Sequence, residues 1–305
     1  MRGRGHRIAV VACHLLSIGI WMTSSGLLRA DEEDPIPLGW ERLTHDGFFK
    51  ERPVWSADGK KLLFSRHLDN EISIIQCDAD GSNEVNLLPS PQPRFGAAWL
   101  PDGKRIVFTF DKITPGQGDM ELYVADLEGK DLQPIFVTQG RLSHEEWGSP
   151  SPDGNWIACT STRDDNSELY LVQVDGKDTQ RLTNDPALDV HPSFSPDGRR
   201  IAFATDRWGD LEIAIYDLQT SLIKRLTESR GLDDYPVWSF DGNQIAWTSR
   251  RDGNLEIYVM QADGSNPRNI TQNETSDNFA AWTPQGEITF SSFQNGAWDL
   301  FVVKP

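Results

Sequence analysis

The hydrophobic and polar positions of this chain repeat in units of about 44 residues. The phrase FSPDG, Phe194 to Gly198, recurs in related form in five other places, and the spacings between the turn glycines are 44, 51, 44, 44 and 44 residues. The turn glycines are Gly59, Gly103, Gly154, Gly198, Gly242 and Gly286. Regularity of this kind predicts a repeat protein with six copies, in which the seven extra residues between the second and third copies are loop insertions.

Each copy has the pattern of short β-strands. In the fourth copy, apolar and small residues alternate from Arg200 to Thr205, an apolar run follows from Leu211 to Asp217, and Leu222 to Thr227 completes the unit. Three and five residues after the turn glycine come apolar residues, here Ile201 and Phe203. Four short strands separated by Gly and Asp turns, in a unit of this length, are typical of one blade of a β-propeller. The pattern predicts an all-β protein, a six-bladed β-propeller of four-stranded antiparallel blades.

The two ends of the repeat region predict that the ring is closed. The last copy stops at Pro305, directly after its predicted third strand, Asp299 to Val303. The segment Trp40 to Thr44, WERLT, matches the closing phrases that end at Thr183 and Thr227. We therefore expect the N-terminal strand to complete the last blade, which removes an exposed sheet edge, and the propeller to occupy residues 39–305.

The N-terminal residues have the order of a secretory signal peptide. Residues 1–30 carry four Arg and no acidic residue, and the apolar run Ile8 to Trp21 is followed by small and polar residues up to Ala30. We predict a signal peptide over residues 1–30 and an acidic linker over 31–38. We expect the chain to be periplasmic or otherwise exported, without a membrane span after the signal is removed. The alternative is an uncleaved anchor, because an apolar run extended through Leu28 would approach the roughly 20 residues that span a bilayer.

Composition and charge narrow the possible partners. The chain has 38% hydrophobic residues, 11 Trp and 14 Phe, which is enough for a packed core, and its formal net charge is −17. An acidic surface repels phosphate backbones, so nucleic acid is not expected as a partner.

After removal of the signal, Cys77 and Cys159 remain, and they fall two blades apart. Because packed sheets are about 10 Å apart and disulfide Cα atoms lie within about 7 Å, we expect both thiols to be free.

No familiar catalytic phrase occurs in the sequence. The nucleophile elbow GxSxG, the zinc motif HExxH and the phosphate-binding GxxxxGK are all missing. The segment Asp78 to Glu84 resembles part of a calcium loop, but its phrase returns as Ala262 to Asn266, which favours tight turns. We expect no catalytic residue and no cofactor, with a divalent cation such as calcium as the one candidate ligand.

The candidate binding residues lie where first strands are expected to begin. The loops that join one blade to the next and those between second and third strands emerge on one side of a propeller, which we call the mouth face. Nine residues before the turn glycine the copies carry Lys50, Arg94, Glu145, Asp189, Asp233 and Asp277. Seven residues before it they carry Arg52, Gly96, Trp147, His191, Tyr235 and Phe279. Acidic loops, Asp164–Asp165, Asp206 to Asp210 and Asp252, and the insertion Lys112 to Gly118 are expected on the same face.

These positions vary although the fold does not require variation. Two basic copies face four acidic ones, and the second set mixes polar and aromatic residues as recognition surfaces do. We expect an exposed surface that binds a partner with charges of both signs, or a peptide end in the channel. Exposed charges contribute little to stability, so we expect the replacement of Asp189 and Asp233 by Asn to weaken binding only. The alternative is a solvated rim on an acidic protein.

The repeated phrases SPDGRRIAFATDR, DLEIAIYD and KRLT resemble the WD-like repeats of the TolB-like propeller family. The similarity covers nearly the whole chain after the signal. It implies a six-bladed propeller of the bacterial periplasm or cell envelope that binds protein partners. Family members of the TolB type carry a small α/β domain before the propeller. Only Asp31 to Leu38 separates the signal from the closing strand here, so we expect that domain to be absent.

Three functions agree with the sequence. The first is an exported, non-enzymatic propeller that binds a protein or peptide, with an envelope protein as a candidate partner, through the mouth face. The second is a propeller that binds or processes a small polar ligand or carbohydrate, with a divalent cation at the acidic mouth. The third is a structural envelope protein.

Overall fold

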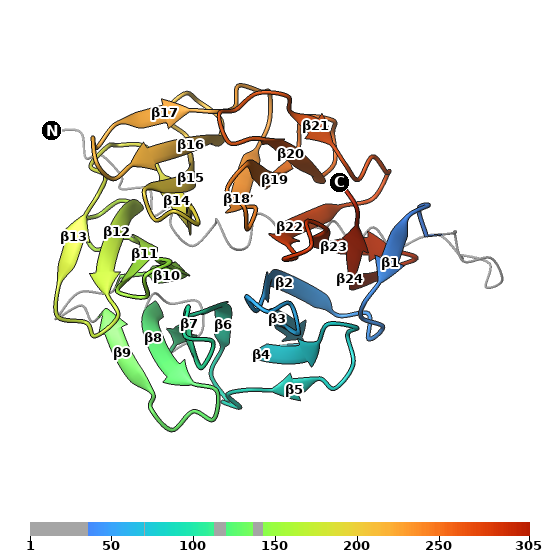
Figure 1. Ribbon diagram of the computed structural model, residues 1–305, viewed down its shortest axis with the longest axis horizontal. Coiled ribbons are helices and arrows are strands. Elements are labelled where there is room, and N and C mark those ends of the chain that lie inside the picture. Colours follow the sequence, from blue (N-terminus) through green and yellow to red (C-terminus); the bar gives the residue numbers. More distant parts are fainter. Residues whose placement is uncertain (1–35, 70, 113–119, 137–142) are drawn as a thin grey trace, which may run out of the picture.

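The computed structural model describes residues 36–69, 71–112, 120–136 and 143–305. Six four-stranded antiparallel sheets follow one another in a ring around a central axis (Figure 1), which confirms the predicted fold. The predicted signal peptide, residues 31–35 of the predicted linker and all but Lys112 of the predicted insertion lie outside the described residues. The described part contains no helix that is long and apolar enough to cross a membrane.

The blades follow the order of the sequence copies. Blade one consists of β2 (Phe49–Trp55), β3 (Lys61–Leu68), β4 (Glu71–Asp78) and β5 (Val85–Asn86). Blade two consists of β6 (Arg94–Trp99), β7 (Arg105–Asp111), β8 (Met120–Asp126) and β9 (Gln133–Phe136). Blade three consists of β10 (Glu145–Pro150), β11 (Trp156–Ser161), β12 (Glu168–Gln173) and β13 (Thr179–Arg181).

The second half of the ring repeats this arrangement. Blade four consists of β14 (Asp189–Phe194), β15 (Arg200–Thr205), β16 (Glu212–Asp217) and β17 (Ile223–Arg225). Blade five consists of β18 (Asp233–Trp238), β19 (Gln244–Ser249), β20 (Glu256–Gln261) and β21 (Arg268–Asn269). Blade six consists of β22 (Asp277–Trp282), β23 (Ile288–Gln294), β24 (Ala297–Val303) and β1 (Trp40–Arg42).

The strands are apolar on both faces because each blade packs against two neighbours. In β15, Ile201 and Phe203 belong to the core cluster shared with blade three. Ala202 and Ala204, which point the other way, belong to the cluster shared with blade five, where Trp247 fills the remaining space. Alternate residues of a strand point to opposite faces, so both sets are removed from water.

The closing strand pairs as the repeated phrase predicted. β1 runs antiparallel to β24, with Trp40 opposite Val303, and lies beside it in Figure 1. The backbone continues the ladder, because Leu43 N–H donates to the carbonyl of Leu300 at 2.8 Å. The Trp40 ring meets Phe290 edge to face, with centroids 4.6 Å apart. Blade six is thus built from both ends of the propeller.

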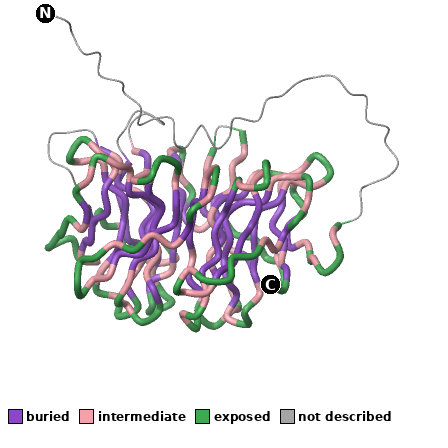
Figure 2. Tube along the Cα trace, turned by 90° about the horizontal axis from the view of Figure 1, so that it is seen from above, coloured by how far each residue is buried: buried purple, intermediate pink, exposed green. Residues whose placement is uncertain are grey.

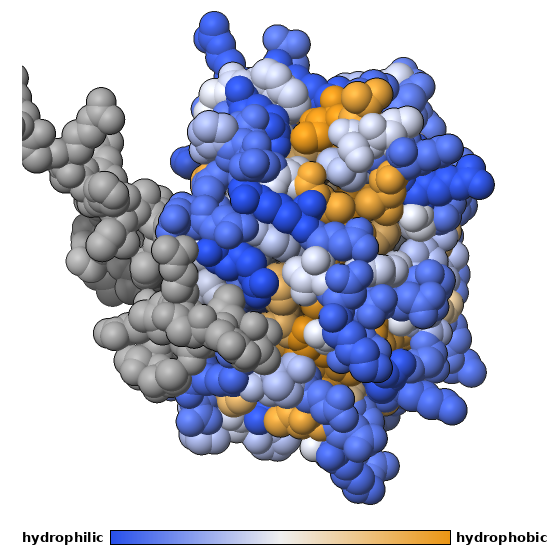
Figure 3. Space-filling view, turned by 90° about the vertical axis from the view of Figure 1, so that its left-hand side faces the viewer, coloured by the Kyte–Doolittle hydropathy of each residue, from blue (hydrophilic) through white to orange (hydrophobic). Residues whose placement is uncertain are grey.

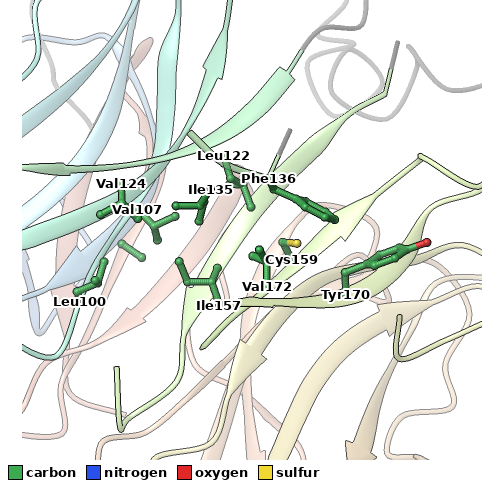
Figure 4. Close-up of a cluster of buried hydrophobic side chains, with 11 residues drawn as sticks. Leu100, Val107, Leu122, Val124, Ile135, Phe136, Ile157, Cys159, Tyr170 and Val172 are labelled. Carbon is green, nitrogen blue, oxygen red and sulfur yellow. The ribbon is translucent and has the colours of Figure 1, made fainter. Parts of the chain in front are cut away.

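The cores lie between blades, and they contain the two cysteines. Figure 4 shows the cluster between blades two and three, in which Cys159 lies among Phe136, Val172 and Tyr170. Cys77 is buried in the cluster between blades six and one. Both thiols are free, as predicted from their separation. Burial raises the pKa of Cys77 to about 12, which makes it a poor nucleophile at neutral pH.

The exposed residues gather on two opposite faces, with buried strands between them (Figure 2). One is the mouth face. The other carries the SPDG-type turns between the first and second strands of each blade, and we call it the turn face. The side of the outer wall seen in Figure 3 is largely hydrophilic, with separate hydrophobic patches.

Candidate functional site

Each first strand is interrupted by a β-bulge seven residues before the turn glycine. The pairing between first and second strands shifts register there in all six blades. The bulge residues are Arg52 (φ 51°), Gly96 (63°), Trp147 (59°), His191 (55°), Tyr235 (54°) and Phe279 (57°). The left-handed conformation costs a residue other than glycine roughly 1–2 kcal/mol. Five of the six blades nevertheless carry a large side chain at this position.

Side chains from neighbouring strands hold the bulges in place. The backbone N–H of His191 donates to Thr160 Oγ1, on the second strand of the preceding blade, at 3.2 Å. The bulge of blade five has no such hydroxyl, because the equivalent residue on the second strand of blade four is Ala204. There the N–H of Tyr235 donates to Asp234 Oδ1 at 2.7 Å instead. The same carboxylate oxygen lies 2.6 Å from His191 Nδ1, so Asp234 links two bulges.

The large bulge side chains meet at the centre of the ring of blades. Trp147 and Phe279 come from opposite blades, three and six, yet their rings stack with centroids 6.1 Å apart. Tyr235 packs against both, at 5.2 and 4.6 Å, and His191 lies 4.3 Å from Tyr235. We call Arg52, Trp147, His191, Tyr235 and Phe279 the channel plug.

Arg52 contributes the charged part of the plug. Its guanidinium lies 4.9 Å from the centre of the Trp147 ring. It donates to the carbonyl oxygens of Gly96 and Gly148, at 2.6 and 2.7 Å, and so spans the first strands of three blades. Burial lowers the pKa of Arg52 to about 10, and the group stays cationic at neutral pH.

A pocket of about 460 Å³ extends from the plug to the turn face. Its floor includes all five plug residues, and its wall is mostly apolar. The wall residues that matter here are Trp99, Pro192, Pro236, Trp238, Phe240 and Trp282. Phe240 is 44% exposed at the rim, where four other copies carry Pro and one carries Ala. A concave apolar site with a few polar groups is the usual form of a ligand pocket.

The plug residues of the predicted surface are therefore brought together, but on a different face. Arg52, Trp147, His191 and Tyr235 line a pocket that extends to the turn face, whereas we expected them at the mouth face. The bulge causes the difference, because it turns these side chains toward the axis.

The six charged residues that lie nine positions before the turn glycines do not join them, and the expectation that they are exposed is wrong. Lys50, Glu145, Asp189, Asp233 and Asp277 are each 0% exposed, and Arg94 is partly buried. Their side chains point between neighbouring blades at the start of each first strand. The premise that Asp189 and Asp233 can be replaced at no cost to stability fails with it.

Most of these buried charges have partners inside the protein. Asp233 accepts from Arg251 at 2.7 Å, and Asp189 is paired with Arg207. A buried charge is tolerated only when it is paired or hydrogen-bonded, and the arginine of the loop between second and third strands supplies the pairing.

Blades one to three vary the arrangement. Lys50 replaces the acid, is paired with Asp46 and lies 3.1 Å from Asp299. The guanidinium of Arg94 lies 4.7 Å from the centre of the Phe110 ring. Glu145 accepts from two serine hydroxyls, and burial raises its pKa to about 7.

The part of the chain that the structure describes contains no preformed metal site. No group of three or more His, Cys, Asp or Glu side chains there is arranged to hold a metal ion. In the segment that resembles a calcium loop, Asp78 is paired with Lys61 and accepts from Asn83 at 2.7 Å. The Asn83 contact lies within the turn between β4 and β5, and the Lys61 contact joins β3 to β4.

Sequence reasoning missed the wall of the pocket. The tryptophans four residues before the turn glycine looked like part of a turn phrase, yet they pack between blades. The indole of Trp238 donates to the carbonyl of Ser193, at 3.2 Å, and that of Trp282 to Val237, at 3.3 Å. The one available signal was Phe240, which departs from the proline or alanine of the other copies.

The comparisons with known proteins agree with this architecture. The chain is 33% identical over 121 residues to the Tol-Pal system protein TolB of Anaeromyxobacter dehalogenans (strain 2CP-C), a match covering 40% of this chain and 26% of that protein. The chain thus spans about a quarter of the length of this relative. The structure of a putative TolB from Agrobacterium tumefaciens matches with a TM-score of 0.61 and 25% identity, over 70% of this chain and 74% of that one.

A more distant likeness concerns the fold alone. The oligogalacturonate lyase of Vibrio parahaemolyticus matches with a TM-score of 0.58 over 90% of this chain and 98% of that one, at 14% identity.

The TolB beta propeller domain family matches residues 66–213 and 209–304. These two matches cover most of the propeller, and the chain belongs to the TolB beta propeller domain family.

Proposed function

We propose that this chain is an exported, non-enzymatic propeller of the bacterial cell envelope that binds a segment of a protein partner in its turn-face pocket. The family membership supports an envelope role, since matched relatives are named as Tol-Pal system proteins. Periplasmic location rests on the signal-like order of residues 1–30. The proposal moves the partner from the mouth face to the turn face.

The observation that carries the proposal is the strained plug beneath the pocket. A propeller needs no aromatic or charged residue at its bulges, and Gly96 shows that glycine is accepted there. Strained backbone persists mainly where the side chain it presents has a use. Here five such residues form the floor of an apolar pocket of about 460 Å³.

The wall indicates the chemistry of the bound segment. Proline and aromatic side chains offer rigid apolar surface, and they lose little conformational entropy when a partner binds. The exposed Phe240 ring stands at the rim, where it can contact the flanks of an inserted residue. We expect the partner to place an apolar or aromatic side chain against the plug, as binding hot spots commonly do.

Affinity capture from an envelope extract tests the proposal, with residues 39–305 immobilised. The variant Phe240→Ala should reduce recovery of the captured partner at least fivefold, and purified partner should show the same loss of affinity. Because Phe240 is largely outside the core, this change should leave the melting temperature unchanged.

The matched control is Trp208→Ala. Trp208 is 41% exposed and lies in a loop of the mouth face, so its loss should not alter capture. The reverse result, in which Trp208→Ala abolishes capture and Phe240→Ala does not, would return the binding site to the mouth face.

One observation favours the second function, binding of a small polar ligand. His191 and Asp234 form a buried pair at 2.6 Å, and His191 and Tyr235 both line the pocket. Calorimetry against neutral and acidic oligosaccharides, with and without calcium, distinguishes the two functions. Saturable binding that His191→Gln removes would support this one.

A further inference from the structure

Two interfaces between blades share an arrangement of two buried acids and two partly exposed arginines. Between blades three and four, Glu168 on β12 accepts from the hydroxyl of Thr183 at 2.6 Å and from Arg181 at 3.0 Å. On the other side of this interface, Asp189 is paired with Arg207. Two buried negative charges thus meet two positive ones.

The interface between blades four and five is built in the same way. Glu212 accepts from Thr227 at 2.6 Å and from Arg225 at 2.9 Å. Asp233, on β18, accepts from Arg251 at 2.7 Å. The charges again balance.

Between blades five and six both acids remain, but both arginines are replaced. Glu256 is 2% exposed and Asp277 is 0% exposed. The strand pairing places Asn269 where blade four has Arg225, because each lies opposite the equivalent residue of the third strand. Asp277 pairs with Ser292 on the second strand, and Gln294 lies two residues after Ser292. In blades four and five the residues at this position are Arg207 and Arg251.

Neutral groups surround the two acids instead. Glu256 accepts from the Thr271 hydroxyl, from Asn254 Nδ2 at 2.8 Å and from Asn273 N–H at 3.1 Å. Asp277 accepts from Asn273 Nδ2. Within the described ranges of the chain, neither acid forms an ion pair.

The charged groups of the surrounding strands are directed elsewhere. β22 packs against β2, β18, β19, β20 and β23. On β20 the facing group is Glu256 itself, and β19 and β23 carry no charged residue. On β2, Lys50 is bound to Asp46 and Asp299, Glu51 lies 2.9 Å from His67, and Arg52 is bound to two carbonyls. On β18, Asp233 is held by Arg251, and Asp234 by His191 and the Tyr235 N–H.

We propose that Asp277 binds a proton in the folded protein, and that this proton replaces the missing arginine charge and makes the interface between blades five and six sensitive to pH. Two buried carboxylates without a cation repel each other and lack hydration, and protonating Asp277 removes the repulsion together with the desolvation cost of its own charge. The proposal concerns stability and does not depend on the proposed function.

The direction of the titration agrees. The pKa of Asp277 is raised to about 7, chiefly by burial and also by the charge of Glu256, although hydrogen bonds from Ser292, Asn273 and Thr271 oppose the shift. In the unfolded chain the pKa of an aspartate is about 3.9. The folded state therefore holds the proton more tightly, so this stabilisation is complete below about pH 4 and is lost as the pH rises toward 7.

Thermal unfolding between pH 4.5 and 8.5 tests the proposal through Asp277→Asn, which mimics the protonated acid. At pH 8 the variant should melt at least about 2 °C above the parent, and the difference should shrink toward pH 4.5. Glu145, whose pKa also lies near 7, is present in both proteins and cancels from the comparison. A difference that does not change with pH would overturn the proposal.

Two further variants keep the test decisive. Asp233→Asn, at an acid that keeps its arginine, should lower the melting temperature without the same gain at high pH. Gln294→Arg, which restores the missing cation, should lower the pKa of Asp277 and make the protein more stable at pH 8. No gain with Gln294→Arg, in a variant that folds, would count against the missing charge as the cause.

A bound metal ion is the competing explanation. If calcium chloride at pH 8 raises the melting temperature of the parent but not of Asp277→Asn, the site takes a metal ion and the proton proposal fails. If calcium has no effect and the pH-dependent difference persists, the proton is the ligand.

Discussion

Ring closure gives the sharpest test of the fold. A chain that begins at Phe48 lacks the whole of β1 together with Leu43 and Thr44, which continue it into the interface. Blade six then has three strands and an open edge at β24. We expect this chain to lose cooperative unfolding, because the two ends of the propeller are then no longer joined within one sheet.

The contacts that are lost set the magnitude. Leu43 is 6% exposed, Trp40 packs edge to face on Phe290, and the Thr44 hydroxyl donates to the buried carboxylate of Asp299 at 2.7 Å. Together these are worth about 4–7 kcal/mol. A typical domain has about 5–15 kcal/mol of total stability, so the loss is a large part of it.

Urea unfolding followed by circular dichroism measures the effect. Relative to a chain that begins at Leu38, the chain that begins at Phe48 should unfold at a midpoint lower by more than about 1 M, or without a single transition. The point variant Leu43→Ala should cost about 2–4 kcal/mol by itself. Equal midpoints for the two chains would refute the reasoning that closure stabilises the ring.

Three further outcomes are expected. Gly81→Ala should destabilise the protein by about 2–4 kcal/mol, measured by urea unfolding, because its Cβ would lie 1.9 Å from the carbonyl oxygen of Leu43 and φ is positive there. Asp233→Asn should cost roughly 2–3 kcal/mol at pH 7, since it leaves a partly buried arginine unpaired, and an unchanged melting temperature would contradict this. Cys77 and Cys159 should react with maleimide only after denaturation, and rapid labelling of the native protein would show that the blade interfaces open.

The repeat predicted most of the fold, because the physics of a blade is local. A turn needs Gly beside Asp, and a strand between two blades needs apolar residues on both faces, so spacing alone located the strands around Arg200 to Thr205. The phrase at Trp40 to Thr44 predicted closure for the same reason, since equivalent strands have equivalent partners. The free cysteines followed from counting blades.

The candidate site was predicted in part. The positions that carry Trp147, His191 and Tyr235 were recognised as varying and as lying on one face, and the structure brings them together in the plug. Their orientation was not predictable, because the bulge is defined by a register shift between strands and no residue type marks it. The pocket wall was not predicted, because a tryptophan such as Trp238 fits the repeated turn phrase and gives no separate sign that it lines a pocket.

Only the tertiary structure decided which charges are exposed. A charged residue in an acidic chain is on the surface by default, and nothing near Asp189 or Asp233 along the sequence shows that an arginine 18 residues later folds back to neutralise it. The sequence near Asp277 likewise does not show that its blade lacks the equivalent arginine. The residue types along the chain determined the blades and their closure, whereas burial and charge pairing depend on contacts between neighbouring blades, which form only when the ring is assembled.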